Sequence, residues 1–310
     1  MKKSLKVLLI LVVLAFATFS AVLGTKILSE ERITTDPSDH YYPAIYGDIV
    51  VWQDNRNGNW DIYGKNLTTG AELVICKYSE TQEFSAIYGD IVVWQDNRNV
   101  NVDIYGYNLK TKEEFRITTN TSDQWHPAIY GDIVVWRDNR NGVSNRDIYG
   151  YNLKTKEEFR ITTNTSSQYK PAIYGDIVVF EDIRNGGFDN FDIYGYNLKT
   201  KEEFRITTNT SAQYNPAIYG DIVVWQDYRN VNVDIYGYNL KTSTEFRITT
   251  NTSDQYEPAI YCDRVVWYDY RNANWDIYIA YLDVVCETPK KSLPMNWIMK
   301  KFGLGSKDKE

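Results

Sequence analysis

The sequence contains few of the residues that common catalytic sites require. Only two histidines, His40 and His126, and three cysteines occur among its 310 residues. The signatures of serine hydrolases, zinc peptidases, dithiol redox proteins and dinucleotide-binding proteins are missing, and so are the Asp boxes of sialidases. We therefore expect no catalytic residue, no cofactor and no bound metal.

An excess of positive charge is missing as well. Lysine and arginine total 34 against 41 acidic residues, which gives a net charge of −7. Proteins that bind nucleic acids neutralise phosphates with a basic face. We therefore expect no nucleic-acid partner, whereas the 43% of hydrophobic residues is enough to build a folded core.

Repetition is what the sequence has in abundance. Six near-copies of about 42 residues run from Pro43 to Leu282, and the fifth reads PAIYGDIVVWQDYRNVNVDIYGYNLKTSTEFRITTNTSDQYE. A fixed period of this length, rich in short strand signals, is typical of propeller blades. The copies begin at Pro43, Ser85, Pro127, Pro171, Pro216 and Pro258.

Each copy predicts four strands separated by turn residues. AIY precedes a Gly-Asp turn, IVVW is an apolar run typical of a strand buried on both faces, and DIYGYNL and EFRITT follow polar loops. We expect the aromatic residue that ends the second strand to pack between blades. In the six copies this residue is Trp52, Trp94, Trp136, Phe180, Trp225 and Trp267.

The fourth strands predict how the ring closes. Copies one to five supply them at Glu72–Cys76, Glu114–Thr118, Glu158–Thr162, Glu203–Thr207 and Glu245–Thr249. The sixth copy lacks one, whereas a matching segment, Glu31–Thr35, precedes the first copy. Because an open sheet edge invites aggregation, we expect this N-terminal strand to complete the last blade. The predicted fold is an all-β, six-bladed β-propeller of four-stranded blades over residues 30–287.

The segments outside the repeats predict export. Three lysines precede an uncharged run from Val7 to Gly24, whose length lies between that of a signal-peptide core and that of a membrane-spanning helix. Residues 1–24 are therefore either a cleaved signal peptide or a retained N-terminal membrane anchor. Residues 288–310 form a basic and apolar C-terminal tail, which either lies on a membrane, remains disordered or plugs the ring.

An Asp-x-Arg pair follows the second strand of every copy, and we expect it to organise the next loop by hydrogen bonds and ion pairing. The first of these loops, Asp54 to Asp61, resembles a calcium loop faintly. Its third position is Arg56, which would repel a cation, so a scaffolding role is favoured. The aspartates are Asp54, Asp96, Asp138, Asp182, Asp227 and Asp269.

Two kinds of covalent modification are consistent with export. Cys262 replaces the glycine of the first turn in the last copy, and a disulfide to Cys286 is one possibility, with Cys76 left as the odd thiol. Five Asn-x-Ser/Thr sequons are either glycosylated or simply good turn formers. They begin at Asn66, Asn120, Asn164, Asn209 and Asn251.

Residues that differ between copies are the candidates for a binding site, because the repeated residues serve what all blades share. The residue before each proline varies, and we expect it in the loops at one mouth of the ring beside a set of aromatic residues. Aromatic residues with Asn and Arg suit recognition of proteins or glycans. The alternative is that the tyrosines wedge between blades and the varying residues merely face water. The candidates are Tyr41, Tyr42, Phe84, Trp125, His126, Tyr169, Lys170, Tyr214, Asn215, Tyr256 and Glu257.

The motif DIYGYNLKTKEEFRITT resembles the repeat of TolB-type propellers, and the match recurs over about 250 residues. The near-identity of the copies resembles the tandem propeller repeats of cell-surface proteins in methanogenic archaea such as Methanosarcina. This resemblance implies a surface or secreted location and a non-catalytic role in binding a surface protein or glycan. The alternative is an exported polysaccharide lyase or hydrolase that uses the channel, which would need a cluster of histidines or metal ligands there.

Overall fold

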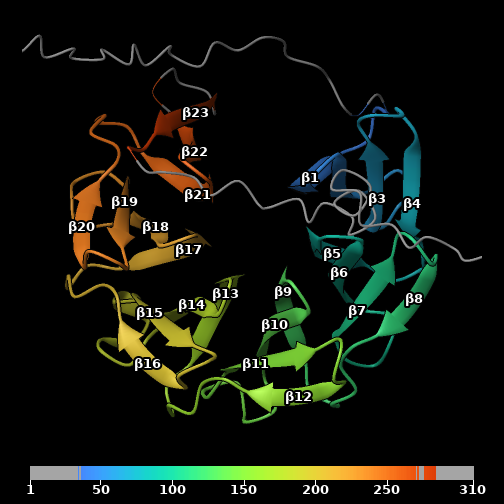
Figure 1. Cartoon of the computed structure of the whole chain (residues 1–310), viewed down its shortest axis with the longest axis horizontal. Coiled ribbons are helices and arrows are strands. Elements are labelled where there is room, and N and C mark those ends of the chain that lie inside the picture. Colours follow the sequence, from blue (N-terminus) through green and yellow to red (C-terminus); the bar gives the residue numbers. More distant parts are fainter. Residues whose placement is uncertain (1–33, 35, 270, 272–275, 284–310) are drawn as a thin grey trace, which may run out of the picture. The chain divides into compact units, whose positions relative to one another are not determined.

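A computed structural model describes residue 34, residues 36–269, residue 271 and residues 276–283. The chain divides into Met1–Thr35 and Asp36–Glu310, and the account below concerns the second unit. Six antiparallel sheets follow one another around a central channel (Figure 1). The all-β, six-bladed propeller predicted from the repeats is confirmed.

Each blade runs from an innermost strand at the channel to an outer strand (Figure 1). The innermost strands are β1 (His40–Tyr46), β5 (Gln82–Tyr88), β9 (Gln124–Tyr130), β13 (Gln168–Tyr174), β17 (Gln213–Tyr219) and β21 (Gln255–Tyr261). The second strands are β2 (Ile49–Asp54), β6 (Ile91–Asp96), β10 (Ile133–Asp138), β14 (Ile177–Asp182), β18 (Ile222–Asp227) and β22 (Arg264–Asp269).

The third strands are β3 (Asp61–Asn66), β7 (Asp103–Asn108), β11 (Asp147–Asn152), β15 (Asp192–Asn197), β19 (Asp234–Asn239) and β23 (Asp276–Tyr281). The outer strands are β4 (Glu72–Cys76), β8 (Glu113–Arg116), β12 (Glu157–Arg160), β16 (Glu202–Arg205) and β20 (Thr244–Arg247). A short 3-10 helix, η1 (Gly187–Asp189), lies in the loop between β14 and β15. Among the described residues the sixth sheet has three strands, and the segment Glu31–Thr35, apart from Thr34, lies outside them.

The hydrophobic core lies between blades rather than within one. One cluster, for example, joins Val93 and Ile104 of the second blade to Val134 and Trp136 of the third. In the second to fifth blades the second strand is buried because its IVVW run meets a neighbouring blade on either side. The prediction that the aromatic residue of this strand packs between blades is confirmed for Trp94, Trp136, Phe180, Trp225 and Trp267, and it stays a prediction for Trp52.

The bounds of two strand types differ from those predicted. The outer strand β8 ends at Arg116 rather than at Thr118, since Ile117 and Thr118 both donate their N–H groups to the carbonyl of Ile104 and interrupt the ladder. The innermost strands begin earlier than the AIY segment. In β9, pairing with β10 already starts at Gln124, opposite Asp138.

The Asp-x-Arg pair organises its loop as predicted. Asp138 is fully buried at the end of β10 and accepts hydrogen bonds from Arg140 through the backbone N–H, Nε and Nη2, at 2.8, 3.0 and 2.7 Å. The indole Nε1 of Trp136 donates to the same carboxylate at 2.9 Å. Arg140 also pairs with Glu158 of the outer strand at 2.5 Å and lies over the ring of Tyr149. One arginine thus joins three strands of its blade.

Several predictions about the chain ends concern residues that the structure does not describe. These are the segment 1–24, the tail 288–310, Cys286 and the outer limits of the propeller at residues 30 and 287. No helix formed by the described residues is long and apolar enough to span a bilayer.

Candidate binding site at the mouth of the channel

The varying residue before each proline lies inside an innermost strand, not in a loop as predicted. At this position the backbone adopts a left-handed conformation, and a shift of register with the second strand marks a β-bulge. Such a backbone is uncommon for residues other than glycine, so its recurrence shows that the blade geometry imposes it. The φ values are 51° at Tyr42, 52° at Phe84, 53° at His126, 43° at Lys170, 54° at Asn215 and 51° at Glu257.

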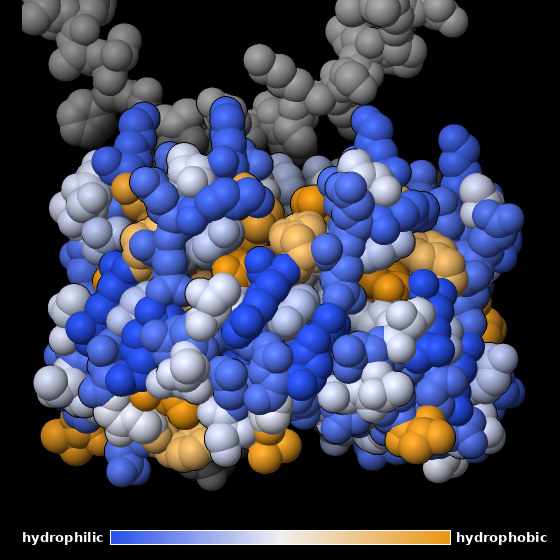
Figure 2. Space-filling view, turned by 90° about the horizontal axis from the view of Figure 1, so that it is seen from below, coloured by the Kyte–Doolittle hydropathy of each residue, from blue (hydrophilic) through white to orange (hydrophobic). Residues whose placement is uncertain are grey.

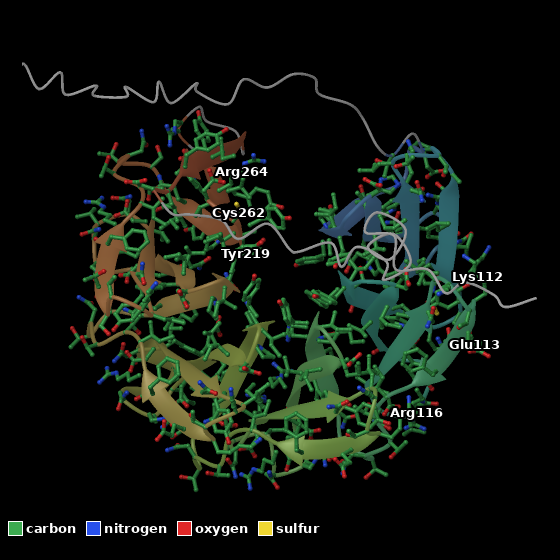
Figure 3. The ribbon with its side chains drawn as sticks, in the orientation of Figure 1. Lys112, Glu113, Arg116, Tyr219, Cys262 and Arg264 are labelled. Atoms are coloured by element: carbon green, nitrogen blue, oxygen red, sulfur yellow. The ribbon has the colours of Figure 1, made fainter. Side chains whose placement is uncertain are left out.

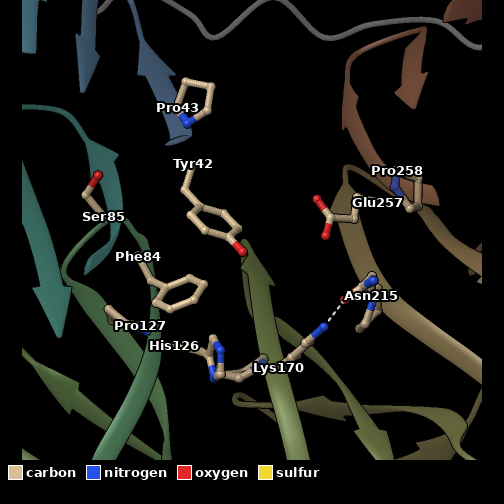
Figure 4. A pocket seen from close by; sticks show the side chains of 12 residues that line it. Tyr42, Pro43, Phe84, Ser85, His126, Pro127, Lys170, Asn215, Glu257 and Pro258 are labelled. Atoms are coloured by element: carbon tan, nitrogen blue, oxygen red, sulfur yellow. Dashed lines mark hydrogen bonds between the residues drawn. The ribbon is translucent and has the colours of Figure 1, made fainter. Parts of the chain in front are cut away.

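The bulge places all six varying side chains around one cavity of about 430 Å3. Figure 4 shows them converging from six strands on the space between them. The rest of the lining is the residue that follows each of them, a proline in five blades and Ser85 in the second. The repeated part of each strand therefore forms a common frame, and the chemistry of the cavity comes from six different residue types.

Aromatic rings form one half of this cavity. The ring of Phe84 lies 4.5 Å from that of Tyr42 and 4.7 Å from the imidazole of His126, centroid to centroid. Burial is the main cause that raises the pKa of the Tyr42 hydroxyl, and the nearby Glu257 adds to it. This half offers a flat apolar wall with a hydroxyl group at its end.

The other half of the cavity is polar. Lys170 donates a hydrogen bond from Nζ to the Oδ1 atom of Asn215, and Glu257 follows in the next blade (Figure 4). A cation, an amide and a carboxylate thus face the aromatic wall.

His126 lies between the two halves and is held neutral. Burial, followed by the positive charges of Arg137 and Lys170, lowers the pKa of its imidazole to about 3. Its Nδ1 atom is buried and has no partner among the described residues. The side chain can therefore take part in hydrogen bonding, but it carries no charge near neutral pH.

A second layer of polar side chains supports the bulges. The Oε1 atom of Gln95 accepts a hydrogen bond from the backbone N–H of His126 at 3.1 Å. In the same way, Glu181 accepts from the N–H of Asn215 at 2.8 Å, and Gln226 accepts from the N–H of Glu257 at 3.1 Å. Each acceptor comes from the second strand of the preceding blade. Burial raises the pKa of Glu181, and the positive charge of Lys170 opposes this effect. Sequence analysis missed this layer, although its position, just before each Asp-x-Arg pair, also varies between copies.

Tyrosines narrow the opposite end of the channel. The last residue of each innermost strand is a tyrosine, and Figure 3 shows one of them, Tyr219, at the inner rim of the ring, with Lys112, Glu113 and Arg116 at the outer rim. Neighbouring rings are 4.6 to 4.9 Å apart along the series. The series is Tyr46, Tyr88, Tyr130, Tyr174, Tyr219 and Tyr261.

The aromatic residues beside the varying positions do not line the cavity. Tyr41 packs against Trp60, with ring centroids 5.4 Å apart, and Tyr169 contacts Phe191 at the same distance. Tyr214 also lies 4.7 Å from Phe191, which belongs to the preceding blade. The alternative of tyrosines that wedge between blades describes Tyr214 and also Tyr169, which contacts Arg137 and Arg146 of the preceding blade. The contact of Tyr41 with Trp60 lies within one blade. Trp125 lies near Arg137, and Tyr256 occupies the equivalent place in β21.

Exposed apolar side chains at the tips of the loops between second and third strands were also missed by sequence analysis. Val100 and Val231 are fully exposed, and Val143 and Phe188 keep 68% and 67% of their surface in contact with solvent. Because these loops all follow the second strand, they lie on the same face as the mouth. Figure 2 shows hydrophobic side chains along one edge of a mainly hydrophilic wall. A valine within a polar Asn-Arg-Asn loop was the signal that could have revealed them.

The modification candidates lie away from the cavity. In four connectors the sequon asparagine accepts a backbone N–H from the serine two residues later, as Asn120 does from Ser122 at 2.9 Å, so it forms a turn whether or not it carries a glycan. Asn66 forms a similar turn at the end of β3, where its Oδ1 atom accepts the N–H of Thr69. Glycosylation stays a prediction. The other three sequon asparagines with this turn are Asn164, Asn209 and Asn251.

The cysteines differ in state. Cys76 is a free, buried thiol, as expected of the odd cysteine, whereas Cys262 is disulfide-bonded and Cys286 lies outside the described residues. Cys262 has a φ of 62°, close to the 59° of Gly220 at the equivalent turn of the preceding blade, so it occupies the glycine conformation.

One group of potential metal ligands occurs in the described part of the chain. Asp36, His40 and Asp54 each offer an atom within 4.8 Å of the others. The carboxylate of Asp54 is already bound by Arg56 at 2.6 Å and by the indole of Trp52 at 3.0 Å. The group therefore fits a hydrogen-bonded terminus of β1 better than a cation site.

Comparison with solved structures agrees with the fold. No protein-family model and no curated protein matches the chain. TolB from Acinetobacter baumannii is similar, with a TM-score of 0.59 and 16% identity over 76% of this chain, which spans only 62% of that protein. The putative TolB from Agrobacterium tumefaciens has a TM-score of 0.56 and 16% identity over 81% of this chain and 93% of its own. The propeller domain of the Trilobed protease from Pyrococcus furiosus has a TM-score of 0.61 and 15% identity, over 78% and 81% of the two chains.

Proposed function

We propose that this six-bladed propeller is a non-catalytic binding protein of the cell surface or the surrounding medium, which recognises a protein or a glycan at the mouth of its channel. One observation carries the proposal. Six strands hold six different residue types in the same left-handed backbone conformation around one cavity. Fold requirements alone would favour the same residue in each blade, so the variation serves recognition.

The apolar loop tips support an interaction at this face. A fully exposed valine does not stabilise a monomer in water, whereas its burial against a partner contributes about 1.5 kcal/mol or more to the free energy of binding. Val100, Val143, Phe188 and Val231 occur in four successive blades and surround the same mouth. A large partner could therefore contact the rim while one of its groups enters the cavity.

The proposed location rests on the ends of the chain. The apolar run from Val7 to Gly24 and the basic and apolar tail fit an exported protein that is either secreted or anchored, as in the methanogen surface proteins that the repeats resemble. Intact mass and membrane fractionation of the native protein test this part of the proposal.

Asparagine substitutions test the mouth without disturbing the strands. Asn215 shows that asparagine fits the bulge, so Lys170→Asn combined with Glu257→Asn should preserve the fold. We expect this variant to lose at least about 90% of binding to glycans on an array, or to biotinylated surface proteins of the producing cells, because both charges of the cavity are gone.

The matched control replaces two lysines that also have a left-handed backbone but lie away from the cavity. Lys112 and Lys156 also have positive φ, at 63° and 64°, but lie in turns between third and outer strands on the opposite face. Binding should survive Lys112→Asn with Lys156→Asn. Equal binding by both double variants would place the site away from the mouth, and cleavage of a bound polysaccharide would favour the alternative of an exported lyase or hydrolase.

Comparison of equivalent positions in the six blades also supports closure of the last blade by the N-terminal strand. In blades two to five a phenylalanine of the outer strand packs on a glycine of the third, as Phe115 does on Gly106. The last blade has Ile279 at the glycine position, and Glu31 stands where the phenylalanine would be. The connector also matches, because Asp36 accepts the N–H of Ser38 at 2.9 Å, as Asn120 does from Ser122.

Crosslinking tests this closure. Aligned on the other blades, Glu30 should pair with Ala280 and Glu31 with Ile279. We expect Glu30→Cys with Ala280→Cys to form a disulfide on mild oxidation, detected by mass spectrometry, whereas Glu31→Cys with Ala280→Cys should not, since adjacent side chains point to opposite faces. Absence of the first crosslink would favour an open ring, like the "open velcro topology" named for the Pyrococcus furiosus domain.

A further inference from the structure

The seam between the third and fourth blades differs from the others in its charge. Arg137 stands in β10 where the same position of the other blades holds Gln53, Gln95, Glu181, Gln226 and Tyr268. Arg146, just before β11, replaces Trp60, Val102, Phe191, Val233 and Trp275. Both arginines occur in the same copy, and the fold itself requires neither, because the other seams form without them.

The two arginines converge on Tyr169 of the next blade. The guanidinium carbon of Arg137 lies 5.7 Å from the centre of the Tyr169 ring and 5.5 Å from that of Trp125. Arg146 lies 5.2 Å from the same tyrosine ring and donates from Nη1 to its hydroxyl at 2.6 Å. Aromatic faces thus hold both cations in place at the seam. Neither arginine lines the cavity, but Arg137 is close enough to the cavity-lining His126 to lower the pKa of its imidazole.

Neither cation is neutralised in the part of the chain that the structure describes. No carboxylate of the described residues lies within 4.0 Å of Arg137 or Arg146, although every arginine of an Asp-x-Arg pair forms an ion pair with its aspartate. The Nε atoms of Arg137 and Arg146 are buried and have no acceptor among the described residues, which is also true of Arg184 and Arg271. Burial, followed by the charge of Arg146, lowers the pKa of Arg137 to about 10.

An anion would remove this imbalance. Lys170 lies on the cavity side of the seam and adds a third cation, whereas Asp123 and the buried Glu181 are the acidic groups close enough to act on Arg137. Three cations against two carboxylates leave about one positive charge. A singly charged carboxylate suits this balance better than a phosphate, which carries close to two charges near neutral pH.

We propose that Arg137 and Arg146 form a subsite for the carboxylate of an acidic sugar whose ring occupies the cavity. Guanidinium groups bind carboxylates by charge-assisted hydrogen bonds. The rings of Tyr42 and Phe84 supply a flat wall for the sugar, and Asn215 and Glu257 supply partners for its hydroxyls. This inference rests on the proposed function and specifies its ligand as a glycan that contains uronic acids.

The test compares an acidic glycan with its neutral counterpart. The probes are a tetramer of β-1,4-linked glucuronic acid and cellotetraose, titrated calorimetrically. We expect the wild-type protein to bind the acidic tetramer more tightly. Arg137→Gln with Arg146→Val restores residues of the other blades, and we expect it to weaken binding of the acidic tetramer about 10-fold or more, with cellotetraose unaffected.

Controls separate this inference from the proposed function. Thermal unfolding should show that the double variant is as stable as the wild type, and Lys154→Gln, in an exposed turn, should leave affinity unchanged. Equal affinity of the wild type for both tetramers, or full retention of acidic binding by the double variant, would overturn the inference. So would stronger competition by inorganic phosphate than by acetate. If the mouth variants alone lose the glycan, the proposed function stands without this subsite. If neither the mouth variants nor the arginine double variant changes binding of the glycan, the proposed function and the carboxylate subsite are both wrong.

Discussion

Replacing Asp138 by alanine is expected to lower the free energy of unfolding by about 3 kcal/mol, because it leaves Arg140 and Trp136 without their buried acceptor. The carboxylate is fully buried and accepts four hydrogen bonds from these two residues. Arg140 keeps Glu158 and the ring of Tyr149, so the loss is smaller than for a cation with no other contact.

The fourth blade supplies the matched comparison. Phe180 replaces the tryptophan there, and Asp182 accepts only two bonds, from the N–H and Nη2 of Arg184 at 2.8 and 2.6 Å. Asp182→Ala should therefore cost about 1 kcal/mol less than Asp138→Ala. Urea denaturation, compared through midpoints, measures the difference. A greater cost at Asp182 would show that the indole bond does not stabilise its blade.

Gly195→Ala is expected to destabilise the protein by about 1–3 kcal/mol through overpacking. A Cβ atom at this position would lie 2.4 Å from the Cζ atom of Phe204, deep inside contact distance. The ring covers the glycine from the outer strand, so relief requires the Phe204 ring to shift or β16 to move away from β15. Thermal unfolding of the purified variant measures the cost.

A double variant distinguishes this contact from a loss of backbone freedom. Phe204→Leu removes the ring, and Gly195→Ala should then cost less than it does in the wild-type background. An equal cost in both backgrounds would assign the effect to the glycine backbone instead. Gly47, which has a φ of 56° and no atom within 4 Å of a Cβ, represents that other mechanism.

The sequence predicted the fold because each blade repeats the same local information. Four strand signals per period, and a Trp or Phe at a fixed place, were enough to indicate blades that pack through their second strands. The Asp-x-Arg network was predictable for the same reason, since Asp138 and Arg140 lie two residues apart and need no distant partner. The link from Arg140 to Glu158 was not predicted, because it depends on the pairing of β11 with β12.

The candidate site was only partly predictable. Variation between copies identified His126 and Lys170, but their place in the cavity depends on a bulge that no local pattern indicates, since residues before proline favour extended backbone. Arg137 and Arg146 come together through the pairing of β10 with β11 in one blade, and the tyrosine that they share, Tyr169, comes from the next blade. A comparison of every varying position, rather than of the position before proline alone, would have found them.

The left-handed bulge also has a consequence for how such a protein can change over generations. Because the frame sets the backbone before any side chain is chosen, a single codon change before a proline can replace one of the six groups around the cavity without moving the other five. Duplication of a blade and its later divergence would then supply new combinations from existing parts. The ring can in this way acquire new ligands by small steps while its architecture is conserved.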